Sequence, residues 1–269
     1  MGEQSLKAEI SDYSKRLHAR GWVANHDGNI TVRLGGGRYL ATPTATSKAA
    51  IGPEDVIVVD ESGAKVSGRG KPFSEIGLHL TVYRNRPEVN AVVHAHPPTA
   101  TGFAVAGPAG SEALSQPILA EAVVSLGVGI PTVPFGPPGP AACNQLAPFV
   151  SGHDAVLLAG NGALCWGVDV EQAYLRMELV EHLAKITLVA QQLGGVRAIP
   201  QSALPALLEA RRKAGLGPQE TQKVVVACAP APPGSDVKVY EAPRKSVLPA
   251  PGDLAAIIRE EIAAAIKKS

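Results

Sequence analysis

The spacing of apolar residues predicts an amphipathic α-helix at the start of the chain. Leu6, Ile10, Tyr13 and Leu17 recur every three or four positions, so they share one helical face. Gly21 follows this run and can end the helix in the left-handed conformation that glycine adopts without strain. We therefore expect this helix to pack its apolar face on the rest of the fold.

Short β segments separated by turns follow this helix. Residues 29–33, 38–41 and 56–59 are predicted strands, and a Gly35-Gly36-Gly37 turn joins the first two. Parallel neighbours would need crossover segments of a dozen or more residues between them. These strands are too closely spaced for that, so antiparallel pairing is expected.

The remaining pattern mixes helices and strands. Ser74 is expected to cap a helix that runs to about Arg86, and residues 90–94 form a β-branched strand that ends at a histidine. A helix is predicted at 99–105, followed by a loop-rich stretch to Pro140 and a helix from there to 150. Strands are predicted at 155–159 and 163–166, on either side of a Gly160-Asn161-Gly162 turn. A long helix is predicted from 169 or 170 to about 194, with Leu175, Leu179 and Leu183 at helical spacing, and a last helix at 202–214.

The composition changes near residue 228. Residues 228–252 are rich in proline and lack apolar periodicity, which indicates a linker. Residues 253–269 then place leucine and isoleucine on one helical stripe, with an acid at the start and lysines at the end. We therefore predict a main domain at 1–227, a linker at 228–252 and an amphipathic helix at 253–269 that needs a partner.

Composition and charge favour a cytoplasmic protein that binds small molecules or other proteins. The chain is 45% hydrophobic and 18% charged, and its 25 basic and 24 acidic residues give a net charge of +1. The chain lacks the excess of basic residues that is typical of a nucleic-acid binder. It also has no apolar run of the length that a membrane-spanning helix needs, so neither nucleic acid nor a membrane is an expected partner. Three cysteines without CxxC spacing argue against a disulfide framework and against a cysteine zinc site.

The strongest local signal for chemistry is His94-Ala95-His96. Alternate residues of a strand point to the same face, so two neutral imidazoles at this spacing can approach one cation. Glu75 follows Ser74 at the start of a predicted helix, where the helix dipole favours a carboxylate. A simple first-turn acid is the alternative for Glu75, and its place before the histidine strand keeps a functional role open.

Two loops combine small residues with hydroxyl groups. They are Asp27-Gly28-Asn29-Ile30-Thr31 and Thr42-Pro43-Thr44-Ala45-Thr46-Ser47. Each can present N–H and O–H donors to an oxyanion or a phosphate. Ordinary turns are the alternative interpretation for both.

Five motifs follow one another along the chain: Gly28-Asn29, Thr42-Pro43-Thr44, Lys71-Pro72-Phe73-Ser74-Glu75, Val92-Val93-His94-Ala95-His96-Pro97 and Leu157-Leu158-Ala159-Gly160-Asn161-Gly162. In this order and spacing they resemble the class II aldolase and adducin family over residues 5–215. The family includes L-fuculose-phosphate aldolase, L-rhamnulose-phosphate aldolase and L-ribulose-phosphate 4-epimerase. The resemblance implies a three-layer α/β/α sandwich on a mainly antiparallel sheet, and a homotetramer with sites near subunit boundaries.

The resemblance also implies a zinc site. His94 and His96 match two of the family's three zinc histidines, and Glu75 matches the carboxylate that binds zinc at rest and serves as the acid-base. A divalent cation can stabilise the enediolate that is left by bond cleavage, and a nearby carboxylate can shuttle the proton. The positions that resemble binders of phosphate or of the substrate oxygens are Gly28, Asn29, Thr44, Ala45 and Ser74.

The chain departs from the family pattern at several of these positions. Asn161 stands where the third zinc histidine is expected, and an amide oxygen is a weaker and harder ligand, so Mn²⁺ and Mg²⁺ join Zn²⁺ as candidates. His153, a water or a neighbouring chain is the expected substitute ligand. Phe73 replaces a serine of the phosphate site of L-fuculose-phosphate aldolase, and Ala45 replaces a glycine.

The proton donor and the C-terminal segment are also unusual. L-fuculose-phosphate aldolase uses a tyrosine of the neighbouring subunit, but this chain has no tyrosine between Tyr83 and Tyr174, and Glu121 is a speculative substitute. The linker and last helix resemble encapsulation peptides of bacterial microcompartment enzymes. We therefore expect residues 253–268 to dock on a shell protein or other cargo, with folding onto the chain's own oligomer as the alternative.

Three functions agree with these patterns. The first is metal-dependent aldol cleavage of a phosphorylated ketose to a three-carbon ketone such as dihydroxyacetone phosphate and an aldehyde such as lactaldehyde. The second is epimerisation or decarboxylation on the same fold, since these reactions share an enolate-type intermediate. The third is a non-catalytic binding module like the head domain of adducin. Glu75, His94 and His96 argue against the third, because a structural domain gains nothing from clustered metal-binding groups.

Overall fold

The computed structural model describes residues 2–107, 110 and 112–217. All of them belong to the first of the chain's two units, Met1–Lys223. The domain boundary predicted at residue 228, the linker and the terminal amphipathic helix lie outside the described residues. They stay predictions.

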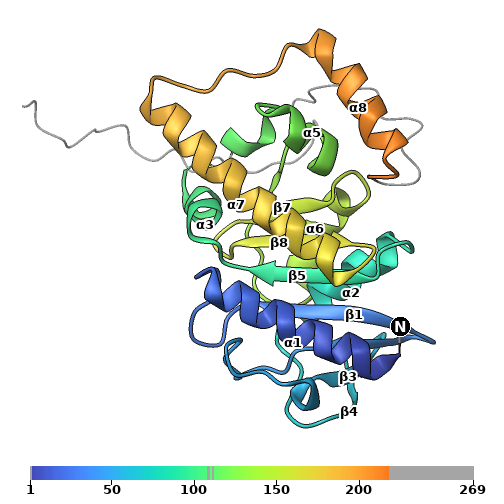
Figure 1. Ribbon diagram of the computed structural model, residues 1–269. Helices are drawn as coiled ribbons and strands as arrows, with labels where there is room; N and C mark the ends of the chain where they lie inside the picture. Colours follow the sequence, from blue (N-terminus) through green and yellow to red (C-terminus); the bar gives the residue numbers. More distant parts are fainter. Residues whose placement is uncertain (1, 108–109, 111, 218–269) are drawn as a thin grey trace, which may run out of the picture. The chain divides into compact units, whose positions relative to one another are not determined.

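An eight-stranded sheet forms the centre of the described chain (Figure 1). Its strand order is β4-β3-β2-β1-β5-β8-β7-β6, and every neighbouring pair is antiparallel except β6 with β7. The mainly antiparallel sheet that the sequence predicted is therefore confirmed. The strands are β1 (Asn29–Gly35), β2 (Arg38–Ala41), β3 (Ile57–Asp60), β4 (Lys65–Ser67), β5 (Ala91–Ala95), β6 (Thr132–Val133), β7 (Ala155–Leu158) and β8 (Ala163–Gly167).

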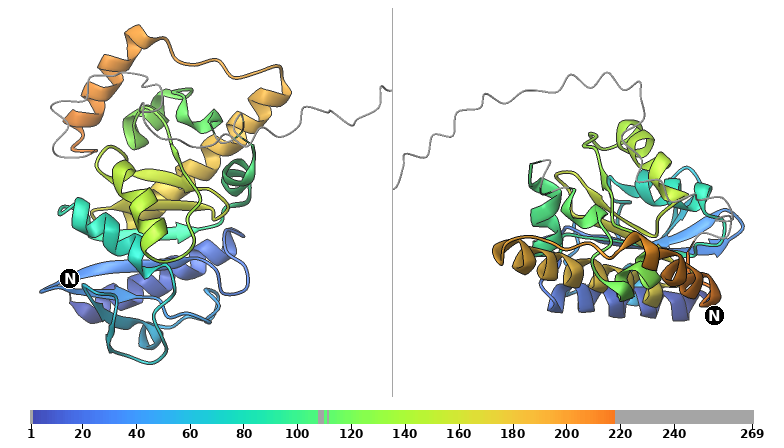
Figure 2. Two further views of the ribbon diagram at one scale, coloured as in Figure 1. Left: turned by 180° about the vertical axis from the view of Figure 1, so that it is seen from behind. Right: turned by 90° about the horizontal axis from the view of Figure 1, so that it is seen from above.

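Helices cover both faces of this sheet and complete the α/β/α sandwich. Seen from above, α1 and α7 lie on one side of the sheet, and α2 and α6 lie on the other (Figure 2). The helices are α1 (Glu3–Ala19), α2 (Ile76–Asn85), α3 (Pro98–Val105), α5 (Ala120–Leu126), α6 (Pro140–Val150), α7 (Val170–Gln192) and α8 (Leu204–Lys213), with 3-10 turns at Pro53–Asp55, Ala113–Ser115 and Gln201–Ala203.

The alternation of side chains along the strands creates two hydrophobic cores. In β5, Val93 and Ala95 pack with the α1 and α7 side, whereas Val92 packs with the α2 and α6 side. Successive residues of a strand point to opposite faces, so a strand that is covered on both sides is apolar at most of its positions. All five residues of β5 are buried, including His94.

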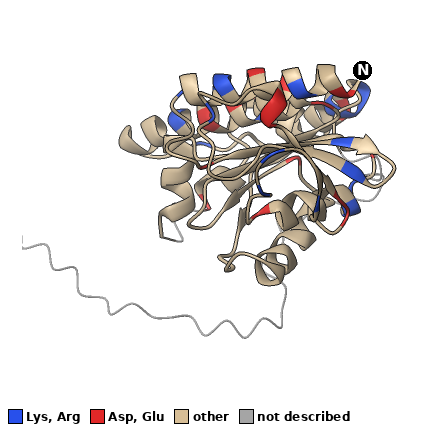
Figure 3. Cartoon of the chain, turned by 90° about the horizontal axis from the view of Figure 1, so that it is seen from below, with Lys and Arg blue, Asp and Glu red and all other residues tan. Residues whose placement is uncertain are grey.

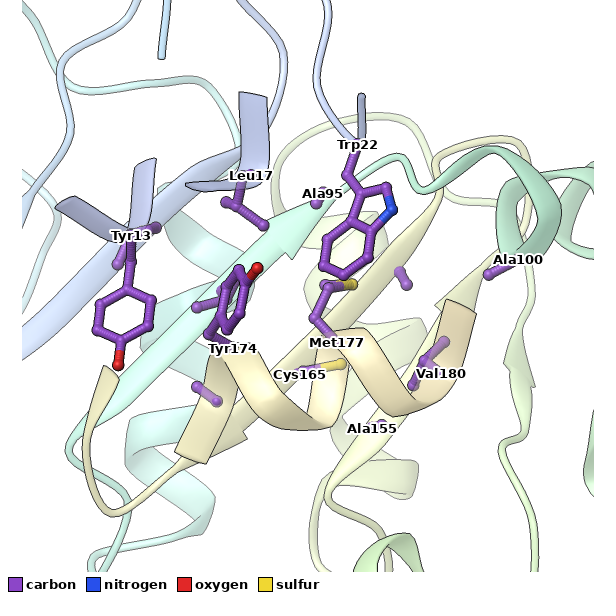
Figure 4. Close-up of a cluster of buried hydrophobic side chains, with 14 of the residues drawn as sticks. Tyr13, Leu17, Trp22, Ala95, Ala100, Ala155, Cys165, Tyr174, Met177 and Val180 are labelled. Atoms are coloured by element: carbon purple, nitrogen blue, oxygen red, sulfur yellow. The ribbon is translucent and has the colours of Figure 1, made fainter. Parts of the chain in front are cut away.

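Aromatic rings join α1 to α7 in the first core (Figure 4). The Tyr174 ring lies 5.1 Å from the Tyr13 ring and 5.8 Å from the Trp22 ring. Tyr174 and Met177 belong to the buried face of α7, whereas Leu175 is 50% exposed. Leu183 is 2% exposed and Leu179 packs against the same core, so the predicted apolar spacing holds for these two residues and fails at Leu175.

Two further expectations differ from the structure. Glu75, not Ser74, occupies the N-cap position of α2, and no side chain caps this helix by a hydrogen bond. The stretch before Pro140 was expected to be loop-rich, but it contains α5 and β6. Both elements are short and depend on tertiary partners: α5 contacts α7 and α8, and β6 pairs with β7. By contrast, the predicted start of α7 is confirmed, since the Asp169 side chain accepts a hydrogen bond from Gln172 N.

A buried ionic cluster lies where β7 begins. Asp154 is fully buried, and its carboxylate contacts the guanidinium groups of Arg86, Arg176 and Arg211. Arg86 also donates to the Val150 carbonyl, and each arginine makes at least one further bond to a backbone oxygen. The cluster therefore ties α2, α7 and α8 to one end of the sheet.

Charged residues of both signs are interspersed elsewhere on the chain (Figure 3). Within the described residues, no helix is long and apolar enough to cross a membrane.

Candidate active site

One end of the sheet collects the motifs that the sequence singled out. β1 begins there at Asn29, which pairs with His94 near the end of β5. β8 begins beside them, because Ala95 pairs with Ala163. β2 ends at the same level, where Thr42 N donates to Ile30 O over 3.1 Å. Antiparallel pairing thus brings together segments that are far apart in the sequence.

His94 in β5 and His96, which directly follows the strand, point ring nitrogens at each other. Their Nε2 atoms lie 3.1 Å apart. His94 is 1% exposed, and its Nδ1 lies 2.9 Å from the carbonyl oxygen of Ala163. A carbonyl oxygen only accepts, so His94 Nδ1 carries the hydrogen and Nε2 keeps a free lone pair when the ring is neutral.

Glu75 lies beside this pair, although it comes from a different element. Its Oε2 is 3.4 Å from His94 Nε2 and 3.5 Å from Asn29 Nδ2. Its Oε1 accepts a hydrogen bond from Asn161 Nδ2. The structure therefore brings together Glu75, His94, His96, Asn29 and Asn161 at one place.

Burial decides the charge of the central histidine. It lowers the pKa of His94, while the nearby Glu75 carboxylate opposes this shift and His96 adds to it. The net pKa is below the ordinary value, so His94 is neutral at neutral pH. A neutral imidazole is the form that binds a metal ion.

The two imidazoles are spaced so that both could approach one divalent cation. Two nitrogen ligands at about 2.0–2.1 Å from one cation stand roughly 3 Å apart, which agrees with the 3.1 Å between the histidine Nε2 atoms. Within the described part of the chain, no group of three or more His, Cys, Asp or Glu side chains is arranged so that it could hold a metal ion. Glu75 contacts His94 and not His96, and Asn29 Oδ1 is buried nearby without a hydrogen-bond partner.

Asn161 does not present its amide oxygen to this group. A carboxylate can only accept hydrogen bonds, so the Asn161 atom that faces Glu75 is its NH₂ group. In this arrangement Asn161 holds Glu75 in place. A ligand role for its oxygen stays a prediction.

The candidate substrate residues separate into two groups. Ser74, Glu75 and Asn161 border a cavity of about 590 Å³ between α2, α6 and the segment that follows β6. Thr44 and Ala45 are exposed and do not border it. The structure therefore places only part of the predicted phosphate cradle at this cavity.

Two of the small residues, Gly28 and Ala45, have backbone conformations that favour glycine. Gly28 has φ 68°, and a Cβ there would lie 2.5 Å from Val23 Cγ1 and 3.0 Å from His94 O. Only glycine fits this approach to the end of β5. Ala45 has φ 55°, a left-handed conformation that favours glycine, and it stands where the resemblance expects a glycine.

Two substitutes that the sequence suggested lie elsewhere. His153 precedes the opposite end of β7, where its Nδ1 is 2.9 Å from Phe149 O, so within one chain it is not a ligand beside Glu75. Glu121 is exposed near the start of α5 and borders a separate cavity of about 640 Å³ together with Trp22. His153 is therefore not the substitute ligand within its own chain, whereas Glu121 as a proton donor to a neighbouring subunit stays a prediction.

The sequence analysis missed three residues near the site. Arg84 borders the cavity from α2, and Phe135 borders it although 69% of its surface is exposed. Asp27 contacts His96, with Oδ2 3.2 Å from Nδ1. Of these three residues, only Asp27 lies in a segment that the sequence marked as a candidate, the Asp27-Gly28-Asn29-Ile30-Thr31 loop.

Lys48 is a buried cation beside the same loop. It is 2% exposed, and its Nζ donates to Thr46 O over 3.1 Å and to His26 O over 3.4 Å. Burial lowers its pKa from 10.5 to about 8, and the charge of Asp27 opposes this shift. Lys48 thus links the two candidate loops at an electrostatic cost.

Lys48 should make stability increase with pH. Between pH 8 and 10.5 the unfolded chain binds a proton at Lys48 and the folded chain does not, so rising pH favours folding. Relative to Lys48→Met, the wild-type free energy of unfolding should rise by about 3 kcal/mol across this window. Urea denaturation at both ends of the window measures it. The exposed Lys65→Met is the control, and an equal response of both variants would contradict the prediction.

The described fold and site have known relatives. Residues 8–188 match the family described as the Class II Aldolase and Adducin N-terminal domain. The 3-oxo-tetronate 4-phosphate decarboxylase of Escherichia coli is 32% identical over 188 residues, which cover 70% of this chain and 88% of that protein. The methylthioribulose-1-phosphate dehydratase of Methylococcus capsulatus is also 32% identical over 188 residues, covering 67% and 91%. An L-fuculose phosphate aldolase of Methanococcus maripaludis is 33% identical over 184 residues, covering 66% and 93%.

Solved structures agree with this grouping. YgbL from Escherichia coli, whose description leaves aldolase, epimerase and decarboxylase open, superposes with a TM-score of 0.70 at 28% identity and covers 76% of this chain and 98% of its own. An L-fuculose 1-phosphate aldolase superposes with a TM-score of 0.68 at 26% identity, covering 77% and 96%. The family match spans more than half of the sequence. The chain therefore belongs to the class II aldolase and adducin family.

Proposed function

We propose that this protein is a metal-dependent lyase that breaks a carbon–carbon bond next to the ketone of a phosphorylated, sugar-derived substrate. The observation that carries the proposal is the convergence of Glu75, His94 and His96 beside a cavity of about 590 Å³. Relatives whose names include a sugar-phosphate aldolase and a phosphate-bearing decarboxylase support the substrate class. Aldol cleavage of a phosphorylated ketose, giving a product such as dihydroxyacetone phosphate and an aldehyde such as lactaldehyde, is the reaction that we put first.

The residues have distinct roles in this proposal. His94 and His96 would hold a divalent cation, and Glu75 would complete its ligands and take up or release the proton of the substrate. When bound, a divalent cation supplies Lewis-acid stabilisation for the negative charge that develops on the ketone oxygen. The amide groups of Asn29 and Asn161 orient the Glu75 carboxylate.

Zinc is our first choice of cation. Imidazole ligands suit zinc and the neighbouring transition metals better than magnesium, which prefers oxygen. Mn²⁺ is the second choice and Mg²⁺ the third, because Asn161 stands where the third histidine is expected and the carboxylate oxygens of Glu75 lie beside the two imidazoles.

Decarboxylation is the second candidate reaction, and one feature of the sequence favours it. An aldol cleavage must remove a hydroxyl proton from the departing aldehyde, but the chain lacks a tyrosine between Tyr83 and Tyr174 for this task. A substrate carboxylate is already ionised and leaves as CO₂ without such a base. A non-catalytic, adducin-like module is the remaining alternative.

A substrate panel with metal analysis tests the proposal. We expect the purified protein to contain or be activated by a divalent cation, to lose activity with a chelator and to regain it with Zn²⁺ or Mn²⁺. Phosphorylated ketoses should release an aldehyde, and phosphorylated 3-oxo acids should release CO₂ if the second candidate is correct. No bound or activating cation and no turnover in either panel would leave the module as the explanation.

Assembly is a separate proposal. We infer a cytoplasmic homotetramer with sites near subunit boundaries, in which residues 253–268 dock on the shell of a bacterial microcompartment. Light scattering on the purified chain tests the tetramer. Fusing residues 229–269 to a fluorescent protein tests the docking, and a diffuse signal in cells that make the shells would exclude it.

A further inference from the structure

We propose that Asp27 is a positioning residue that selects the tautomer of His96. In this proposal Asp27 accepts the hydrogen on Nδ1 of His96, so that Nε2 presents a bare lone pair toward His94. The benefit of this lone pair rests on the proposed metal function, but the tautomer itself does not depend on a metal.

The proposal starts from the ring nitrogens of the two histidines. His94 Nδ1 donates to Ala163 O, so His94 Nε2 is bare in the neutral ring. His96 Nε2, 3.1 Å away, has two options. It either carries a hydrogen and donates it to His94, which blocks both nitrogens, or it is bare and both lone pairs are free for a cation.

Asp27 offers the hydrogen of His96 a competing acceptor. Its Oδ2 lies 3.2 Å from His96 Nδ1, an ion-pair contact whose distance also allows an N–H···O hydrogen bond to form. A hydrogen bond to a carboxylate is roughly twice as strong as one between neutral groups. The Nδ1–H tautomer is therefore favoured over a neutral Nε2–H···Nε2 bond. An acidic partner behind a metal-binding imidazole fixes its tautomer in the same way in metalloproteins generally.

The loop that carries Asp27 is fixed against the end of β5. His96 N donates to Trp22 O over 2.8 Å, and Trp22 is packed beside Tyr174 and Met177 (Figure 4). At the other end of the loop, Gly28 approaches His94 O so closely that a Cβ would be 3.0 Å away. The loop therefore meets β5 on both sides of Asp27.

The carboxylate itself is held by its own turn. Asp27 Oδ1 accepts from Ala24 N, and Asp27 N donates to Ala24 O over 3.0 Å. Lys48 Nζ donates to the carbonyl of His26, the residue directly before Asp27. Oδ1 and the backbone are thus occupied, which leaves Oδ2 for His96.

Asp27→Asn is the test variant. Its amide oxygen can still accept from Ala24, but the NH₂ group in place of Oδ2 cannot accept from His96. Asp60→Asn is the matched control, because Asp60 Oδ1 also organises a turn, accepting from Ser62 N over 2.9 Å and from Ala64 N over 3.0 Å. Asp60 lies at the end of β3 and makes no contact with the histidines in the described structure.

Nitrogen-15 NMR of the histidine rings in the metal-free protein gives the first readout. We expect His96 to be the Nδ1–H tautomer in the wild type and in Asp60→Asn, and to shift to Nε2–H in Asp27→Asn. Finding Nε2–H in the wild type, or the same tautomer in all three proteins, would overturn the proposal.

Calorimetric titration with Zn²⁺ gives the second readout. Asp27→Asn should bind zinc about 10–100-fold more weakly than the wild type, while Asp60→Asn should match the wild type. Equal zinc affinities in all three proteins would count against the role of Asp27. If the wild type binds none of Zn²⁺, Mn²⁺ and Mg²⁺ in this kind of titration, the proposed function fails, whereas the NMR result still decides for or against Asp27.

Discussion

Glu75→Gln is expected to lower kcat/KM by about 10²–10⁴-fold while the protein stays folded. Glutamine matches glutamate in size, so the contact with Asn161 can persist through its amide oxygen. The glutamine side chain cannot take up a proton. The variant also lacks the negatively charged carboxylate that lies 3.4 Å from His94 Nε2 in the wild type. Turnover is measured on the substrate that the panel identifies, and the melting temperature is measured beside it.

The control for this variant is Glu61→Gln. Glu61 is an exposed glutamate outside the cavity, and its replacement should leave turnover unchanged. If Glu75→Gln retains more than about a tenth of the wild-type kcat/KM, proton transfer by Glu75 is wrong. If Glu75→Gln unfolds instead, a Glu75→Asp variant separates the loss of folding from the loss of proton transfer. Aspartate keeps the negative charge but places the carboxylate one methylene group further from the histidines.

Asp154→Ala is expected to destabilise the protein by about 3–5 kcal/mol. The loss follows from the charge balance, since the side chain is 0% exposed and contacts three arginines that are at most 7% exposed. Without the carboxylate, Arg86, Arg176 and Arg211 repel one another in a low-dielectric region. Urea denaturation gives the change in the free energy of unfolding.

The exposed ion pair of Asp12 and Arg16 provides the control. Its atoms lie 2.8 Å apart, but the two side chains are 57% and 53% exposed. Water screens such a pair, so Asp12→Ala should cost no more than about 1 kcal/mol. A loss of this small size in Asp154→Ala would mean that the arginines find other partners or that water enters the cluster.

Local patterns were sufficient for much of the fold. Leu6, Ile10 and Leu17 predicted α1, and the β-branched run before His94 predicted β5. Periodicity works here because each element buries its own face, and the spacing of apolar residues records that face. The same reasoning failed for α5 and β6, which are too short to carry a period and are held by α7, α8 and β7.

The sequence by itself determined which residues are candidates for chemistry in this protein. It identified Glu75, His94 and His96 as candidates, and the family resemblance set the expectation of an α/β/α sandwich. Only the tertiary structure decided which groups meet. Asp27 lies 69 positions before His96, and Asp154 meets Arg86 across 68 positions and Arg211 across 57. Such pairs leave no local pattern, because strand order and helix packing, not spacing along the chain, bring their side chains into contact.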